Sequence, residues 1–124
     1  MRSITVMIVE PKKAPYTKTI EVERLGEELS NLVGGTAESF PVGVKGVYGY
    51  CNDEGKIKGF PVNRQVYYGD IIHGNMMLIA FDEEDEPISL NCFQSMELMR
   101  RFTDTDISEA IYREYLKECG IIIE

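Results

Sequence analysis

The spacing of apolar and polar residues predicts a first half of the chain made of two strands and a helix. Residues 4–9 form an almost continuous apolar run rich in β-branched side chains, which is typical of a strand buried on both faces of a sheet. Residues 16–22 alternate between apolar and polar positions and predict a half-exposed strand that pairs back on the first. A helix over residues 25–33 follows, because its leucines recur at helical spacing and a glycine pair ends it.

The middle of the chain predicts further strands joined by tight turns. Residues 47–58 form a predicted β-hairpin around the turn sequence Asn52-Asp53-Glu54-Gly55. The segment 59–64 cannot be a central strand, since its proline has no amide to donate to a neighbouring strand. Apolar runs predict further strands at residues 71–72, 76–81 and 87–90.

The last third of the chain predicts two short helices. Asn91 and Gln94 form a capping pattern for the first, and its apolar side chains repeat on one face as Phe93, Met96, Met99 and Phe102. Asp106 and Glu109 repeat the capping pattern before a second stripe, made of Ile107, Ala110, Ile111, Tyr115 and Cys119. The tail Ile121-Ile122-Ile123 is expected either to pack against the sheet or to take part in self-association.

The order of these elements predicts an α+β fold with a mainly antiparallel sheet, one helix after the second strand and two C-terminal helices. No linker, repeat or low-complexity tract divides the chain, so residues 1–124 are predicted to form one domain. A chain of this length buries enough surface to fold without disulfides or metals.

Charge and cysteine content narrow the class of protein. The chain has 13 Lys and Arg against 21 Asp and Glu, a formal net charge of −8, which argues against direct nucleic-acid binding through a basic face. Cys51, Cys92 and Cys119 are widely separated and odd in number, so we expect neither a disulfide framework nor a zinc site, and a cytoplasmic location. No apolar run is long enough to predict a membrane span, and no cofactor or metal is predicted.

Three features that could carry chemistry each have a simpler explanation. His73 follows Asp70 and could act as an acid or base, but it is also a plain strand-end histidine, and no cysteine lies in a nucleophile motif. The acidic run 82–86 lacks the ligand spacing of an EF-hand and predicts a solvated turn. The glycines at 43, 46 and 49 match no phosphate-binding motif and favour a bent or bulged strand.

The segment 59–68 is the main candidate for ligand binding. Arg64 has the side chain best suited to a two-pronged grip on phosphate or carboxylate, and the neighbouring aromatic rings could stack on a flat ligand. The simpler alternative is that Asn63 organises a turn and Arg64 pairs with one of the many acids. The predicted binding residues are therefore Asn63, Arg64, Tyr67, Tyr68, Phe60 and His73.

The same segment belongs to a series of short motifs that are familiar in their order and spacing. They are Val9-Glu10-Pro11, Val33-Gly34-Gly35, Cys51-Asn52-Asp53-Glu54-Gly55-Lys56, Gly59-x-Pro61-x-Asn63-Arg64, Asp70-Ile71-Ile72-x-Gly74 and Phe81-Asp82-Glu83-Glu84 before Ser89-Leu90. Over residues 4–102 the sequence resembles the family called domain of unknown function 3846, small proteins of bacteria, phages and mobile elements. The resemblance implies no activity and no catalytic residues, and it leaves residues 103–124, a helix and an apolar tail, outside the family-like core.

Three hypotheses about function remain open. The first is a non-catalytic accessory protein of phage or mobile-element type that holds an anionic small molecule such as a nucleotide, or a protein partner, through the 59–68 segment. An alternative is an acidic protein-interaction inhibitor or DNA mimic that engages a basic site on its partner. A small hydrolase using His73 or a cysteine lacks a motif that supplies nucleophile, base and orienting group together. Homo-oligomer formation through the apolar tail and the Met-rich helix is compatible with all three.

Overall fold

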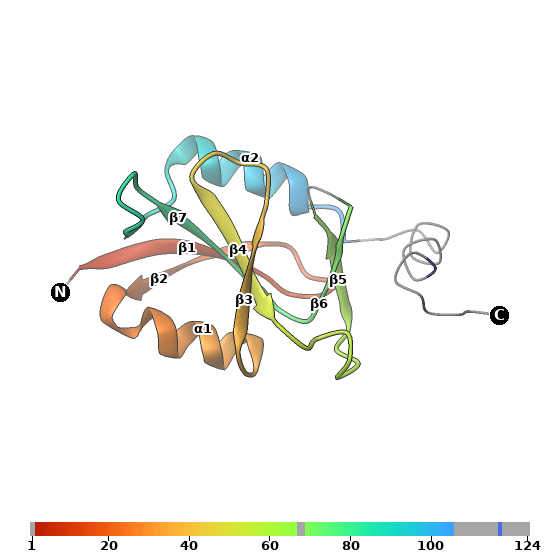
Figure 1. The fold of residues 1–124 in the computed structure, drawn as a ribbon. Coiled ribbons are helices and arrows are strands. Elements are labelled where there is room, and N and C mark those ends of the chain that lie inside the picture. Colours follow the sequence, from red (N-terminus) through yellow and green to blue (C-terminus); the bar gives the residue numbers. More distant parts are fainter. Residues whose placement is uncertain (1, 67–68, 106–116, 118–124) are drawn as a thin grey trace.

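The computed structural model describes residues 2–66, 69–105 and 117 (Figure 1). Its main element is a six-stranded antiparallel sheet with the strand order β2-β1-β7-β4-β3 and with β8 beside β7. The strands are β1 (Ser3–Val9), β2 (Tyr16–Glu21), β3 (Ala37–Pro41), β4 (Val47–Asn52), β7 (Met76–Phe81) and β8 (Pro87–Ile88). Two short strands, β5 (Val62–Gln65) and β6 (Ile71–His73), form a second antiparallel sheet. The predicted α+β class with a mainly antiparallel sheet is confirmed.

Two α-helices cover opposite faces of the main sheet (Figure 1). Helix α1 (Leu25–Val33) follows β2 through a 3-10 turn, η1 (Val22–Arg24), and helix α2 (Cys92–Phe102) follows β8. The described residues thus hold one helix near the C-terminus, where the sequence predicts two. Apart from Lys117, the second predicted helix and the isoleucine tail lie outside the described residues.

The central strands β1 and β7 are buried on both faces, which explains their continuous apolar runs. Alternate side chains of β7 enter two different cores, because successive side chains of a strand point to opposite faces. Met76, Leu78 and Ala80 pack on the side of α2, and Met77 and Ile79 pack on the side of α1.

The turn after β4 is not the hairpin that the sequence predicts. Residues 53–59 form consecutive turns, and β4 pairs with β3 and β7 instead of with a returning strand. The Asn52 side chain accepts a hydrogen bond from the Glu54 amide at 2.7 Å, and the Lys58 amide donates to the Glu54 carbonyl at 2.9 Å. These local bonds satisfy the backbone within the turn, so that no partner strand is needed.

Helix α2 begins at the predicted capping box, in which Asn91 and Gln94 exchange two hydrogen bonds. The predicted apolar stripe is nevertheless largely outside the core, since Phe93 is 74% exposed and Met96 is 67% exposed. The buried face carries Gln94, Leu98 and Phe102. Two side-chain contacts hold the helix in this orientation. The Gln94 side-chain amide donates to the Lys45 carbonyl, and Arg101 donates to the Val42 carbonyl.

The prediction for the acidic run agrees with the structure, whereas the prediction for the glycines at 43, 46 and 49 does not. The acidic segment 82–86 is a tight turn in which the Asp82 carboxylate accepts hydrogen bonds from the amides of Glu84 and Glu86. Gly43 and Gly46 lie in the connection between β3 and β4, where their φ angles of 75° and 78° favour glycine. Gly49 pairs in regular register within β4, so these glycines do not form the bent or bulged strand that the sequence predicts. Within the described part of the chain, no helix is long and apolar enough to cross a membrane.

Candidate functional site

Arg64, the main candidate for anion binding, is buried inside the fold. The residue is 3% exposed, and each of its side-chain N–H groups has a protein acceptor. Nε and Nη2 donate to the Phe102 carbonyl at 3.2 and 2.9 Å, and Nη2 also donates to the Lys13 carbonyl at 2.6 Å. Nη1 donates to the Glu10 carbonyl at 3.2 Å and to Asn63 Oδ1 at 2.8 Å. Since a guanidinium has five N–H donors, none remains for a phosphate or carboxylate ligand.

Asn63 has an equally internal role. It is 1% exposed, and its Nδ2 donates to the carbonyls of Val9 at 2.7 Å and Gly74 at 2.8 Å. Together Asn63 and Arg64 connect the β5-β6 sheet to the end of β1 and to the C-terminal end of α2. The ligand-binding interpretation of the pair is therefore corrected, because the donors of both side chains are taken by acceptors inside the protein. Burial lowers the pKa of Arg64 from its ordinary value, and the charge of Asp104 opposes that shift.

The other predicted site residues lie near this network. His73 is on β6, and its Nδ1 lies 3.0 Å from the Phe60 carbonyl oxygen. The Phe60 ring packs on Gly74, where an added Cβ would come within 2.8 Å of the ring and the φ of +86° already favours glycine. Tyr67 and Tyr68 lie outside the described residues. Of the four predicted residues that the structure describes, Phe60 lines a recess of about 440 Å³ beside Pro61 and Gly74. His73 lines a second recess, next to the end of β4.

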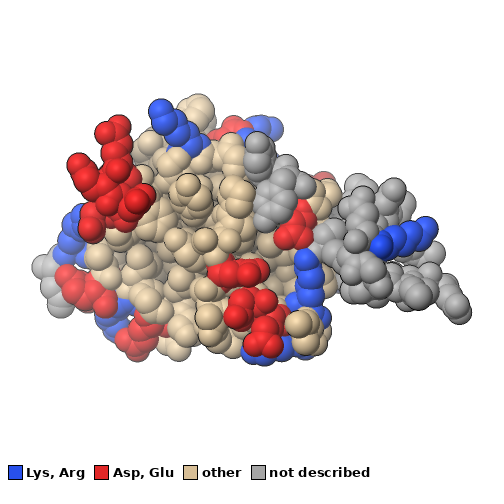
Figure 2. Space-filling model, viewed as in Figure 1, with Lys and Arg blue, Asp and Glu red and all other residues tan. Residues whose placement is uncertain are grey.

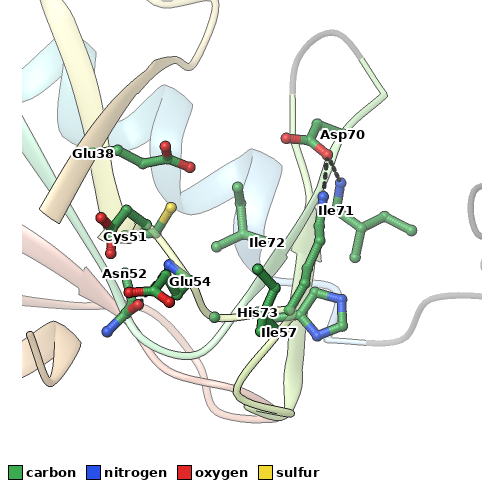
Figure 3. A pocket seen from close by; sticks show the side chains of 12 residues that line it. Glu38, Cys51, Asn52, Glu54, Ile57, Asp70, Ile71, Ile72 and His73 are labelled. Atoms are coloured by element: carbon green, nitrogen blue, oxygen red, sulfur yellow. Dashed lines mark hydrogen bonds and ion pairs between the residues drawn. The ribbon is translucent and has the colours of Figure 1, made fainter. Parts of the chain in front are cut away.

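That recess is an acidic hollow of about 210 Å³, formed where the end of β4, the following turn and β6 meet. Four carboxylates line it against a single lysine, Lys56: Glu38, Asp53, Glu54 and Asp70. Figure 3 shows Glu38 and Cys51 on one side of the hollow and Asp70 on the other, with Ile72 between them. The floor includes the buried side chains of Cys51, Ile71 and Ile72. The hollow therefore combines an acidic rim with an apolar floor.

Local contacts hold the turn 53–57 in place around the hollow. Asn52 Nδ2 donates to the Val33 carbonyl at 3.0 Å, which anchors the start of the turn to the end of α1. Lys56 Nζ lies 3.0 Å from the Asp70 carboxylate, and that carboxylate also accepts from the Ile71 amide at 2.9 Å. Gly55 lies directly against β6, because an added Cβ would come within 2.6 Å of the His73 carbonyl oxygen. The shape of the hollow thus depends on contacts between segments that are far apart in the sequence.

Cys51 is the cysteine that lines the hollow, and its surroundings keep its thiol protonated. Burial, together with the charges of Glu38, Asp70 and Asp53, raises the pKa of Cys51 to about 12. Cys51 is therefore a neutral thiol at physiological pH and a poor nucleophile. Among the side chains that the structure describes, no three of His, Cys, Asp or Glu are grouped so that they could hold a metal ion.

The fold and this hollow fall within a region that a known family shares. The sequence model of the family described as domain of unknown function 3846 matches residues 3–103, which include every strand and both α-helices described above. The chain belongs to this family. No curated protein and no solved structure matches it.

In this member of domain of unknown function 3846, the motif residues mainly hold the fold together. Asn52 and Gly55 shape the turn at the hollow, whereas Asn63, Arg64 and Gly74 form the buried network behind it. Among the residues that line the hollow, the sequence predicted only His73 as a binding residue. The available signal was the density of polar residues in Cys51-Asn52-Asp53-Glu54-Gly55-Lys56, but Glu38 comes from a distant strand and has no local signature.

The raised pKa of Cys51 predicts a thiol that does not react in the folded protein. At pH 8 we expect iodoacetamide to modify Cys51 in urea-unfolded protein and to leave it unmodified in native protein, as measured by mass spectrometry of tryptic peptides. Folding raises the pKa of Cys51 from 9.0 to about 12, so between these pH values the folded protein holds a proton that the unfolded chain has lost. The free energy of unfolding therefore has its full Cys51 contribution below pH 9 and loses it as the pH rises toward 12. Equal modification of Cys51 in native and unfolded protein would contradict this assignment.

Proposed function

We propose that the protein is a non-catalytic binding protein whose acidic hollow accepts a lysine or arginine side chain of a protein partner. The observation that carries this proposal is the combination of four rim carboxylates with an apolar floor in one recess. Lysine and arginine have an aliphatic stem and a charged head, so the stem can contact Cys51 and Ile72 while the head meets the carboxylates.

The size of the hollow favours a single side chain over a small-molecule ligand. Its volume of about 210 Å³ is below the roughly 300–1,000 Å³ of typical small-molecule sites. A nucleotide is further disfavoured by charge, because the one lysine of the hollow is already paired with Asp70 and the donors of Arg64 are occupied. At this hollow, a protein partner is therefore the better supported version of the accessory-protein hypothesis.

An apolar side chain beside the hollow supports contact with a protein surface. Ile57 lines the hollow and is 84% exposed, which makes it the most exposed large apolar side chain among the residues described. Protein interfaces combine such apolar anchors with a polar rim. Ile57 and the carboxylates would thus contact neighbouring parts of the same partner.

The distribution of acids favours a local contact over imitation of DNA. Figure 2 shows the acidic side chains of this face in separate groups, with neutral surface between them. A DNA mimic would need a continuous array that matches the regular spacing of phosphates. We therefore keep the hypothesis of an acidic protein-interaction inhibitor, but with the hollow as its single contact site. A cytoplasmic location in a phage or mobile-element setting remains part of the proposal.

Titration with a hexa-arginine peptide, followed by amide NMR shifts and calorimetry, tests this proposal. Shifts are expected at residues 51–57 and 70–73, and the double variant Glu38→Gln/Asp53→Asn is expected to bind about fivefold more weakly, because each exposed charge pair contributes a few tenths to 1 kcal/mol. The matched control, Glu83→Gln/Glu84→Gln, removes the same charge from the 82–86 turn and should bind normally. Equal weakening by both double variants, or shifts spread over the whole surface, would exclude the hollow as the site.

A further inference from the structure

The recess beside Phe60, of about 440 Å³, lies where four separate segments of the chain meet. They are the turn between β1 and β2, the end of α1, the approach to β5 and the connection between β6 and β7. The apolar part of its lining includes Phe60, Pro61, Pro11 and Leu32. Small-molecule sites are typically roughly 300–1,000 Å³ in volume and mainly apolar. This recess, the Phe60 recess, therefore has the size and the lining of a small-molecule site.

Buried hydrogen bonds fix the walls of the Phe60 recess. Asn63 joins two of these walls, because its Nδ2 donates to the carbonyls of Val9 at 2.7 Å and Gly74 at 2.8 Å. Arg64 holds the turn between β1 and β2, since its guanidinium donates to two backbone carbonyls of that turn at 3.2 and 2.6 Å. The recess is thus formed before a ligand arrives, which lowers the cost of ordering the protein on binding.

The Phe60 ring packs against two glycines and stays partly exposed. An added Cβ would lie 3.9 Å from the ring at Gly34 and 2.8 Å from it at Gly74, where the φ angles are +76° and +86°. The side chain is half-buried, and it lines the recess together with both glycines. Aromatic rings pair with other flat rings in offset or edge-to-face arrangements. Phe60 therefore supplies a fixed aromatic surface for a flat ligand.

The charges at the Phe60 recess suit a ligand with one negative group. Lys13 lines the recess, is exposed, and forms no ion pair with a carboxylate in the described part of the chain. Lys58 lies close by, with its Nζ 3.7 Å from where a Cβ at Gly35 would stand. Glu10 is the one carboxylate among the described lining residues, and it has a partner of its own. Burial and a hydrogen bond to that carboxylate raise the pKa of Tyr16 from its ordinary value.

We propose that the Phe60 recess binds a small aromatic molecule that carries a single negative group. The ring of the ligand lies against Phe60 and the two prolines, and its anionic group pairs with Lys13. A polyanion fits less well, because one lysine lines the recess and the chain has a net charge of −8. Arg64 acts in this site from behind, by holding its wall. This inference does not depend on the proposed function of the acidic hollow.

Amide NMR titration of the full chain with naphthoate tests this inference, and naphthalenemethanol serves as a neutral probe with the same rings. Naphthoate is expected to shift the amides of residues 10–13, 32–34 and 74–75. Lys13→Gln should bind naphthoate about three- to fivefold more weakly and naphthalenemethanol as before, because it removes the charge and keeps the apolar lining. Lys45→Gln is the matched control, since it removes an equal charge from the connection between β3 and β4, and it should bind both probes normally.

Phe60→Leu tests the ring separately from the charge. It should weaken the binding of both probes by about threefold or more, because leucine keeps an apolar side chain but offers no aromatic face. Circular dichroism of each variant checks that the fold is kept. Shifts centred on α2 or on residues 42–48, equal weakening by Lys13→Gln and Lys45→Gln, or no saturable shift with naphthoate would each overturn the inference.

Discussion

Replacing Arg64 with alanine is expected to lower the free energy of unfolding by about 3–5 kcal/mol. The side chain joins three separate parts of the protein, through the carbonyls of Glu10, Lys13 and Phe102. Its removal leaves the Phe102 carbonyl and Asn63 Oδ1 without their donor in a buried place, and each unsatisfied buried group costs about 1–3 kcal/mol. The Glu10 and Lys13 carbonyls lose their donor at partly buried positions. The loss therefore combines several penalties at one position.

Urea unfolding followed by circular dichroism measures this effect. Arg100→Ala is the matched control, because that side chain is 70% exposed and its partner among the described residues is Glu97 of the same helix, so a change below about 1 kcal/mol is expected. Arg64→Lys should fall between the two, since an ammonium keeps the charge but offers three donors in place of five. A loss in Arg64→Ala no larger than in Arg100→Ala would refute the buried network as a stabilising unit.

Replacing Gly49 with alanine is expected to cost about 2–3 kcal/mol, although the residue lies in a regular strand. Gly49 of β4 stands directly opposite Phe40 of β3, and the Phe40 ring lies over the glycine. An added Cβ would overlap the ring, which is 5% exposed and packed in the core on the α2 side. The ring would have to leave its rotamer or move the strand, because the core has no free space around it.

A double-mutant cycle attributes this cost to the ring. Phe40→Leu alone should destabilise the protein, but in the Gly49→Ala background its additional cost should be smaller by about 1 kcal/mol or more, because the overlap has been removed. Gly26→Ala is the control substitution, since nothing lies within 4 Å of that position in α1, and it should stabilise the protein by about 0.5–1 kcal/mol. Strictly additive effects of Phe40→Leu and Gly49→Ala would contradict the assignment.

The prediction for Arg64 changes the meaning of the family motif around that residue. A buried arginine with five internal hydrogen bonds is a structural element, so variants at this position would lose function through loss of folding. The search for a binding surface moves instead to the acidic hollow, whose rim residues Glu38 and Asp53 are exposed and can be changed without disturbing the core. Comparing the two kinds of variant separates folding from binding.

Features that depend on local patterns could be predicted from the sequence. The continuous apolar runs at residues 4–9 and 76–81 predicted buried strands, because a strand covered on both faces has no polar side to show. The leucine spacing and the glycine after residue 33 predicted α1, whose C-cap Gly34 has the left-handed conformation that glycine favours. Asn91 and Gln94 predicted the start of α2, since a capping box is formed by residues three apart.

The role of Arg64, the rotation of α2 and the acidic hollow became apparent only in the folded chain. The carbonyl acceptors of Arg64 lie 38 to 54 residues away. Every residue type carries a backbone carbonyl, so these acceptors leave no trace in a sequence. The Lys45 and Val42 carbonyls are likewise invisible in the sequence. By accepting from Gln94 and Arg101 they hold α2 with its most apolar side directed away from the core. Side-chain patterns along the chain determine secondary structure, whereas pairing between distant backbone groups determines which surface is left for a partner.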